Sequence, residues 1–194
     1  LYGLPSWYGA WYMYVNVTML EEAGIEVPRG DWTWDEFREI CLNVTDAEKG
    51  IWGLSDRHSD GPSAHYWYML NGGGAFNDEM TECTINSPEV VQAMKFLQEL
   101  IYVDKVAPPP STYATTAADQ MFRDGKAAFH YNGTWAANYF RVSEDVMDFE
   151  WDVIFAPNGP GAKQPVTPAR SSGMFIPANA KDIETSWAVM KQWG

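Results

Sequence analysis

Acidic side chains are the residues of this chain that could most directly catalyse a reaction. A glycosidase needs two carboxylates in different environments on either side of one bond. The acids here concentrate instead in predicted turns and on predicted helix surfaces, at Asp35, Glu36, Asp46, Glu48, Asp78, Glu79, Glu144, Asp145 and Asp148. The sequence contains no G-x-S-x-G elbow, no H-E-x-x-H motif and no Walker A loop. We therefore expect a binding protein, with no catalytic residue, no metal site and no cofactor.

The histidines and cysteines form no ligating or nucleophilic cluster in the sequence. His130 stands in a short apolar run, where we expect a hydrogen-bonded core residue, and His58 is expected in a surface loop. Cys41 and Cys83 lack metal-ligand spacing and are too few for a disulfide framework. Two buried free thiols are favoured, and a bridge between them is the alternative.

Aromatic side chains offer a different chemistry. The chain has 10 Trp, 10 Tyr and 9 Phe, which together are 15% of its residues. Most of these rings are needed to fill a core, but flat rings can also cover the apolar C–H faces of pyranose sugars while polar neighbours bind the hydroxyls. A formal net charge of -13 argues against nucleic acid and anionic membranes as partners. The composition therefore favours carbohydrate as the ligand class.

One segment, residues 121–140, places a tryptophan where a ligand could bind. Residues 127–131 are predicted to form a buried strand after a charged turn. Gly133 breaks that strand, and Thr134 is expected to cap a helix that carries Trp135 in its first turn. The carboxyl end of a strand beside a helix N-terminus is where open α/β sheets bind ligands. Trp135 is therefore the first candidate contact.

The elements around this segment predict an α/β fold. Strands are expected at 12–15, 51–54, 127–131, 151–155 and 174–176, and helices at 17–23, 34–42, 63–71, 116–122, from 88 and from 183. Thr33 and Glu36 have the spacing of a capping box for the second of these helices. The longest helix is capped by Ser87, and its predicted buried stripe is Val91, Met94, Leu97, Leu100 and Ile101.

Short motifs along the whole chain resemble those of one protein family. They are, in order, YGLP (2–5), MLEEAGI (19–25), DWTWDEF (31–37), GIWGL (50–54), NGGG (71–74), INSPE (85–89), VAPP (106–109) and F-x-x-G-K-A-A-x-x-x-x-G-x-W (122–135). This series resembles the extracellular solute-binding proteins of family 1, the maltose-binding-protein-like sugar receptors of bacterial ABC importers.

The resemblance implies a periplasmic-binding-protein type II fold, in which two lobes close on a ligand. Family members have the opening βα units of the first lobe before the position of the YGLP motif. The chain is therefore expected to be an excised middle piece that covers mainly the second lobe. In that arrangement residues 1–11 cross from the first lobe, 12–168 form the second, C-terminal lobe, and 169–194 are a crossing strand and a helix that return to the first lobe.

The resemblance also marks candidate ligand contacts. The aromatic residue that matches Trp135 stacks on sugar in many family members, and the alternative is a core tryptophan that joins helix to sheet. His65 and Tyr66 begin a helix that contributes aromatic contacts in this family, although Tyr66 could equally be a core residue.

The two crossing segments supply the remaining candidates. Trp7, Tyr8 and Trp11 are expected in the loop of the first crossing, where family members usually have polar residues, and this departure suggests an extended stacking platform. Arg170 and Ser171 lie at the second crossing, where the family has a turn that lines the cleft. The guanidinium of Arg170 could hydrogen-bond sugar hydroxyls or neutralise a nearby acid.

The function implied by the resemblance is that of the substrate-binding component of an ABC importer. It would capture a sugar or oligosaccharide in the periplasm or outside the cell, anchored there as a lipoprotein, and deliver it to the transmembrane permease subunits. The alternatives are a stand-alone carbohydrate-binding module and a receptor for another small polar solute. If residues 172–194 return to a first lobe, the apolar face of Trp187, Met190 and Trp193 would be exposed here, and we expect self-association.

Overall fold

The structure, a computed structural model, describes residues 4–56, 61–142 and 147–193. The chain divides into two compact units. We call Trp11–Pro168 the central unit, and Leu1–Ala10 together with Ala169–Gly194 the flanking unit. His58 lies outside the described residues, so its expected place in a surface loop stays a prediction.

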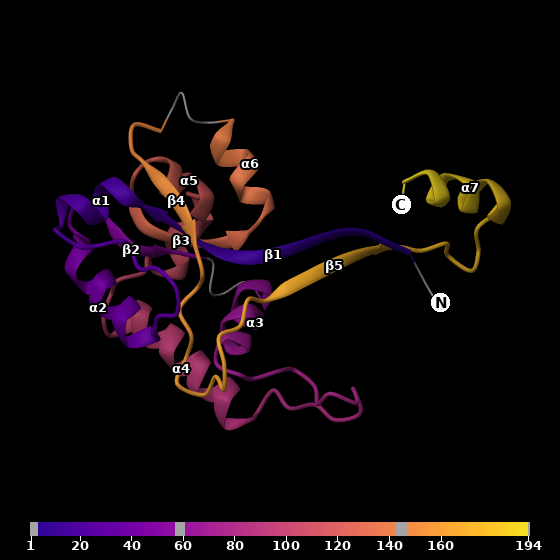
Figure 1. Cartoon of the computed structure of the whole chain (residues 1–194), viewed down its shortest axis with the longest axis horizontal. Helices are drawn as coiled ribbons and strands as arrows, with labels where there is room; N and C mark the ends of the chain where they lie inside the picture. Colours follow the sequence, from indigo (N-terminus) through magenta and orange to yellow (C-terminus); the bar gives the residue numbers. More distant parts are fainter. Residues whose placement is uncertain (1–3, 57–60, 143–146, 194) are drawn as a thin grey trace. The chain divides into compact units, whose positions relative to one another are not determined.

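A mixed sheet runs through the central unit in the order β2-β3-β1-β4 (Figure 1). Strand β1 (Leu4–Asn16) pairs antiparallel with β3 (Ala127–Gly133) on one side and with β4 (Trp151–Ile154) on the other. Strand β2 (Trp52–Ser55) is parallel to β3. The two strands that flank β1 therefore both run opposite to it, and β1 is the central strand of the fold.

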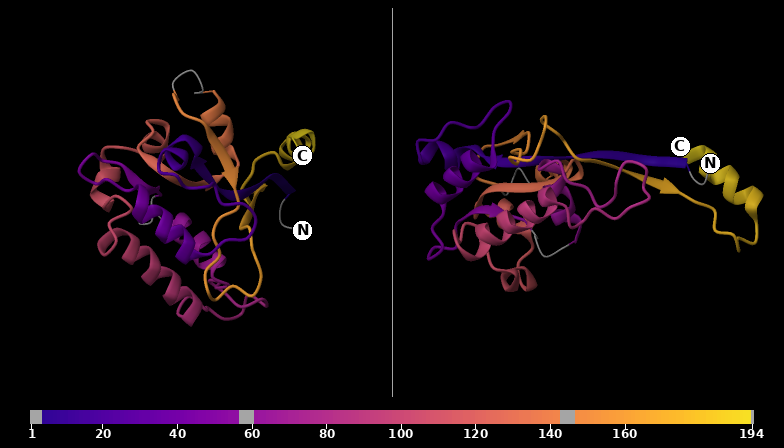
Figure 2. Two further views of the ribbon diagram at one scale, coloured as in Figure 1. Left: turned by 60° about the vertical axis from the view of Figure 1, so that its left-hand side comes forward. Right: turned by 90° about the horizontal axis from the view of Figure 1, so that it is seen from below.

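Helices cover both faces of this sheet (Figure 1, Figure 2). One face carries α2 (Trp34–Val44), α3 (Gly61–Leu70) and α4 (Pro88–Tyr102), and the other carries α5 (Ala118–Arg123) and α6 (Trp135–Arg141). The connections include α1 (Val17–Glu22) after β1 and the short 3-10 helix η1 (Pro110–Ala114) before α5. Helices on both faces of a mixed sheet confirm the predicted α/β class.

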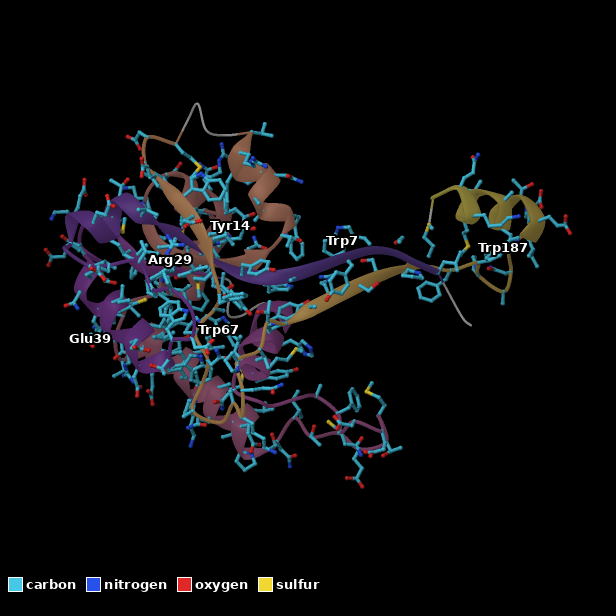
Figure 3. The ribbon with its side chains drawn as sticks, viewed as in Figure 1. Trp7, Tyr14, Arg29, Glu39, Trp67 and Trp187 are labelled. Atoms are coloured by element: carbon cyan, nitrogen blue, oxygen red, sulfur yellow. The ribbon has the colours of Figure 1, made fainter. Side chains whose placement is uncertain are left out.

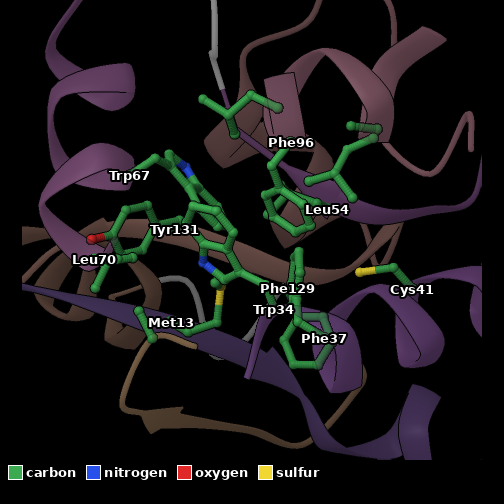
Figure 4. Close-up of a cluster of buried hydrophobic side chains, with 14 of the residues drawn as sticks. Met13, Trp34, Phe37, Cys41, Leu54, Trp67, Leu70, Phe96, Phe129 and Tyr131 are labelled. Atoms are coloured by element: carbon green, nitrogen blue, oxygen red, sulfur yellow. The ribbon is translucent and has the colours of Figure 1, made fainter. Parts of the chain in front are cut away.

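Two separate cores result, because side chains alternate between the faces of a strand. On β1, Trp11, Met13 and Val15 belong to the larger core, and Tyr14 belongs to the smaller one. The larger core is rich in aromatic rings that come from α2, α3, α4 and β3 (Figure 4). Trp34 of α2 stacks almost flat on Phe96 of α4, with 4.3 Å between the ring centroids. The abundance of aromatic residues is thus largely a packing feature, as expected.

Local sequence signals set several helix ends as predicted. The backbone N–H of Glu36 donates to the Thr33 hydroxyl, and the Glu36 carboxylate accepts from the Thr33 N–H at 2.7 Å, which completes the capping box. The Ser87 hydroxyl caps α4. Gly24, with φ of 71°, follows the end of α1 in the left-handed conformation that glycine adopts without strain.

The predicted buried stripe of α4 is wrong in part. Val91 and Met94 are 41% and 38% exposed, whereas the residues that α4 buries are Val90, Ala93, Phe96, Leu97 and Leu100. A strict three-residue step rotates steadily around a helix of 3.6 residues per turn. Steps that alternate between three and four residues stay on the core side.

Asn71 joins three segments of the central unit through its buried side chain. Its amide nitrogen donates to the carbonyl of Glu89 at 2.8 Å and to the side chain of Gln92 at 3.0 Å, and its oxygen accepts from the N–H of Gly161 at 2.8 Å. The loop that contains Gly159 and Gly161 can approach Asn71 closely because these residues have no side chain. A Cβ atom at Gly159 would lie 2.2 Å from the Asn71 side-chain oxygen, and one at Gly161 would lie 2.6 Å from the Asn71 carbonyl.

The flanking unit contains a two-stranded ribbon and helix α7 (Ile183–Trp193). Strand β5 (Ala169–Met174) pairs antiparallel with the first half of β1, from Ala10↔Ala169 to Leu4↔Met174. The strand predicted at 174–176 is therefore misplaced. The segment that forms the strand is polar and lacks an alternating pattern, so its conformation follows from pairing with β1.

Both cysteines are free thiols, as favoured from the sequence. Cys41 is buried as expected, but Cys83 is exposed, in a loop where it forms an isolated β-bridge with Phe76. Within the described part of the chain, no helix is both long and apolar enough to cross a bilayer.

We predict that Asn71→Ala lowers the free energy of unfolding by about 2–4 kcal/mol, because it removes three hydrogen bonds that the buried Asn71 side chain makes to α4 and to the loop at Gly161. Asn138→Ala is the matched control. Asn138 is exposed on α6, and its loss should change stability by less than about 0.5 kcal/mol. Urea denaturation followed by circular dichroism measures both, and equal midpoints for the two variants would contradict the assigned role of Asn71.

Candidate ligand-binding site

A half-exposed tryptophan marks the carboxyl end of β3. The strand ends at Gly133, helix α6 begins at Trp135, and 38% of Trp135 is exposed. The edge of one ring meets the face of the other where Trp135 contacts Trp11, with centroids 5.2 Å apart and planes at 86°. Trp11 in turn stacks on Tyr66 at 4.0 Å. Trp135 therefore presents an accessible surface that two other aromatic rings support from within the central unit.

Gly133 allows the Trp135 ring to lie against the backbone of the turn. A Cβ atom at Gly133 would lie 2.0 Å from a carbon of the Trp135 ring. No side chain can occupy that space without moving the ring. The NG-x-W spacing of the sequence thus has a physical reason, because the glycine makes room for the tryptophan two residues later.

A polar network around the buried His130 lies beside this turn. His130, which is 2% exposed, has its Nδ1 2.7 Å from the carbonyl of Ser55 and its Nε2 2.9 Å from a carboxylate oxygen of Asp119. The side chain of Asn132 donates to the same oxygen at 2.9 Å and accepts from the N–H of Gly133 at 2.8 Å. The hydrogen bond from His130 lowers the pKa of Asp119, although burial acts in the opposite direction. His130 is the satisfied core residue that the sequence predicted.

His65 extends the site along α3. Its ring meets Tyr66 edge-on, with centroids 5.5 Å apart, and its Nδ1 is hydrogen-bonded to the hydroxyl of Tyr68. Burial lowers the pKa of His65 below its ordinary value of 6.5. The imidazole is therefore neutral at pH 7, and a neutral ring suits an uncharged ligand better than an anionic one.

The remaining candidates belong to the flanking unit and are described separately. Trp7 and Tyr8 lie in β1, not in a loop as expected, because they pair with Ser172 and Ser171 of β5. The guanidinium of Arg170 stands 6.0 Å from the centre of the Trp7 ring, and the hydroxyl of Ser171 donates to the Trp7 carbonyl. Tyr8 is 73% exposed. The ribbon thus presents the accessible rings of Trp7 and Tyr8, and the Trp7 ring (labelled in Figure 3) has a cation near it.

Comparison with known proteins identifies the family. Residues 2–191 match the model of the bacterial extracellular solute-binding proteins. The chain belongs to this family. The resemblance seen in the sequence motifs is thereby confirmed.

Solved relatives have the same fold. An ABC substrate-binding protein from Listeria monocytogenes in complex with cycloalternan is 28% identical, with a TM-score of 0.85 over 99% of this chain and 47% of that chain. Maltose-bound T. maritima MalE3 is 26% identical, with a TM-score of 0.77 over 98% of this chain and 49% of that chain. These similarities confirm the predicted type II fold of the periplasmic binding proteins.

Curated relatives match either nearly the whole chain or about half of it. A putative binding protein of Brucella abortus is 24% identical over 190 residues, which are 97% of this chain and 45% of the relative. The arabinooligosaccharide-binding protein of Halalkalibacterium halodurans is 28% identical over 106 residues, 55% of this chain and 23% of the relative. This chain therefore spans about half the length of the solute-binding proteins that it matches over nearly its whole length.

Several residues of the candidate site play roles that differ from those predicted from the sequence. Trp11 and Tyr66 are 5% and 6% exposed and contribute support beneath Trp135, so Trp11 does not extend an open platform in this structure. Thr134 does not cap α6, since its side chain makes no capping hydrogen bond. Tyr14, which was not predicted as a site residue, also contributes, because its buried hydroxyl forms hydrogen bonds to the same turn. The sequence near Tyr14 shows only an aromatic residue in the strand before Asn16, which does not indicate this role.

Proposed function

We propose that this chain is the sugar-contacting lobe of a substrate-binding protein that serves an ABC importer. The observation that carries the proposal is the half-exposed Trp135 ring, which Trp11 and Tyr66 support from behind. A flat ring in this setting can cover the apolar face of a pyranose. The likeness to receptors with bound maltose and cycloalternan supports carbohydrate as the ligand class.

The polar groups near Trp135 suit binding of a neutral molecule. His65 is uncharged at neutral pH, and the carboxylate of Asp119 is already bonded to His130 and Asn132. Transfer of a proton to a glycosidic oxygen needs a free acid of raised pKa beside the bond. The arrangement therefore supports a receptor that is not an enzyme and that uses no cofactor or metal.

Capture would depend on closure of two lobes. The central unit would be the second lobe, and the paired strands β1 and β5 would be the crossing segments, which contribute Trp7, Tyr8, Arg170 and Ser171 to the ligand. Binding shifts such a protein toward its closed form, which the transmembrane permease subunits then recognise. The complete receptor would act in the periplasm or outside the cell, held to the membrane as a lipoprotein.

A panel of neutral oligosaccharides tests the function directly. Malto-, xylo-, cello- and arabino-oligosaccharides are incubated with the complete receptor for an extended period, and the mixture is then separated by chromatography. We expect stoichiometric retention of at least one sugar, and no new product. Turnover of any member that is lost on substitution of a single carboxylate would contradict the receptor function, as would the absence of retention across the panel.

We predict that Trp135→Ala in the complete receptor weakens binding of the retained sugar by about 1–3 kcal/mol, because the stacking surface is lost. The melting temperature should change little, since the ring is partly exposed. Titration calorimetry and thermal unfolding measure the two effects separately.

Tyr139→Ala provides the control for Trp135. Tyr139 lies on the same helix, is 45% exposed, and contacts Arg123 away from the turn. Its removal should leave affinity unchanged. Equal affinity for wild type and Trp135→Ala, or a lower melting temperature alone, would assign Trp135 to the core.

The flanking unit carries an apolar groove that would be covered in a complete receptor. The groove has a volume of about 550 Å³, and its apolar lining is Met174, Phe175, Ile176, Pro177, Val189 and Met190. Phe175 and Val189 are 66% and 56% exposed, and Trp187 on the same helix is 44% exposed. Exposed apolar patches of this kind drive association.

We therefore predict that residues 1–194 expressed alone form dimers or larger species at high concentration. The double variant Phe175→Ser, Val189→Ser should be monomeric. Val142→Ser, which removes a lone side chain that is 86% exposed on the central unit, should still associate. Multi-angle light scattering measures all three. A monomeric wild type would contradict the prediction.

A further inference from the structure

Helix α6, which begins with Trp135, lacks the local cap that its sequence suggests. Thr134 precedes the helix with φ of -53° and ψ of -25°, which is already a helical conformation. Capping side chains normally belong to residues in an extended conformation, because only then does the side-chain oxygen reach the N–H groups of the first turn. The Thr134 hydroxyl accordingly makes no capping hydrogen bond.

A residue distant in the sequence provides the missing acceptor. The hydroxyl oxygen of Tyr14 accepts from the N–H of Ala137 at 3.0 Å, in the first turn of α6. The same hydroxyl donates to the carbonyl of Gly133 at 2.8 Å. Tyr14 thus bonds to the turn on both sides of Trp135, at the last residue of β3 and at the third residue of α6.

The Tyr14 ring is itself held firmly. Tyr14 is 1% exposed, it pairs with His130 across the sheet, and its ring meets Phe140 of α6 edge-on with centroids 5.1 Å apart. Burial raises the pKa of Tyr14 to about 12. The hydroxyl therefore keeps its proton at physiological pH and can donate to Gly133 at all times.

We propose that Tyr14 is a positioning residue that fixes the stacking surface of Trp135 without touching the ligand. The inference rests on the proposed function of Trp135. The ring of Trp135 lies against Gly133 and meets the Trp11 ring at 86°, so a small shift of the turn changes both contacts. A hydroxyl that holds Gly133 and Ala137 together prevents that shift. Tyr14 would thereby lower the cost of ordering the platform when a sugar binds.

Tyr14→Phe in the complete receptor removes the hydroxyl and keeps the ring. We expect affinity for the retained sugar of the panel to fall roughly three- to tenfold, the effect of one net hydrogen bond. Amide exchange at Ala137 should become faster without any ligand. The control is Tyr131→Phe, because Tyr131 is equally buried but its hydroxyl has no hydrogen-bond partner among the described residues. Tyr131→Phe should leave both quantities unchanged.

A double-mutant cycle separates positioning from a general structural role. If Tyr14 acts through Trp135, Tyr14→Phe should change affinity by less than about twofold once Trp135 is already alanine. An equal loss in both backgrounds would overturn the proposal, and so would unchanged Ala137 exchange in Tyr14→Phe. If Trp135→Ala alone leaves affinity intact, the proposed function fails instead. In that case faster Ala137 exchange in Tyr14→Phe would support the cap and reject its role in binding.

Discussion

The position of β1 at the centre of the sheet is the constraint on which the rest of the structure depends. Because a strand sends successive side chains to opposite faces, Trp11 and Tyr14 enter different cores. Both nevertheless meet the turn between β3 and α6. Trp11 makes a T-shaped contact with the Trp135 ring, and Tyr14 forms hydrogen bonds to the backbone on both sides of Trp135. One strand thus supports the candidate site from both faces of the sheet.

The site combines an apolar surface with polar groups that are already satisfied. The carboxylate of Asp119 is hydrogen-bonded to both Asn132 and His130 beside the turn. The pKa of Asp119 is lowered, so the carboxylate stays ionised and keeps these hydrogen bonds. Such a network gives rigidity, because each member would lose a partner if the turn moved. Rigid aromatic surfaces bind sugars at a small entropic cost, which suits reversible capture.

Local signals in the sequence predicted much of the fold. Three helix ends illustrate this, because each depends only on residues within four positions of one another. They are the capping box at Thr33, the N-cap at Ser87 and the glycine that ends α1 at Gly24, and all three are present in the structure. Trp135 was also found locally, from its place after a short strand and a glycine. The features that the sequence did not predict depend on contacts between residues far apart in the chain. The strand at Ala169–Met174 forms by pairing with β1, and the cap of α6 comes from Tyr14, 123 residues earlier in the chain. No local pattern contains either partner.

A crystal structure of the complete receptor with its retained sugar is the most direct test of the central claim. The account predicts a pyranose ring stacked on the accessible face of Trp135, at about the 3.5–4.0 Å of carbon–carbon contact. Trp11 and Tyr66 should lie behind that ring. A sugar bound elsewhere, with Trp135 covered by protein side chains, would contradict the account.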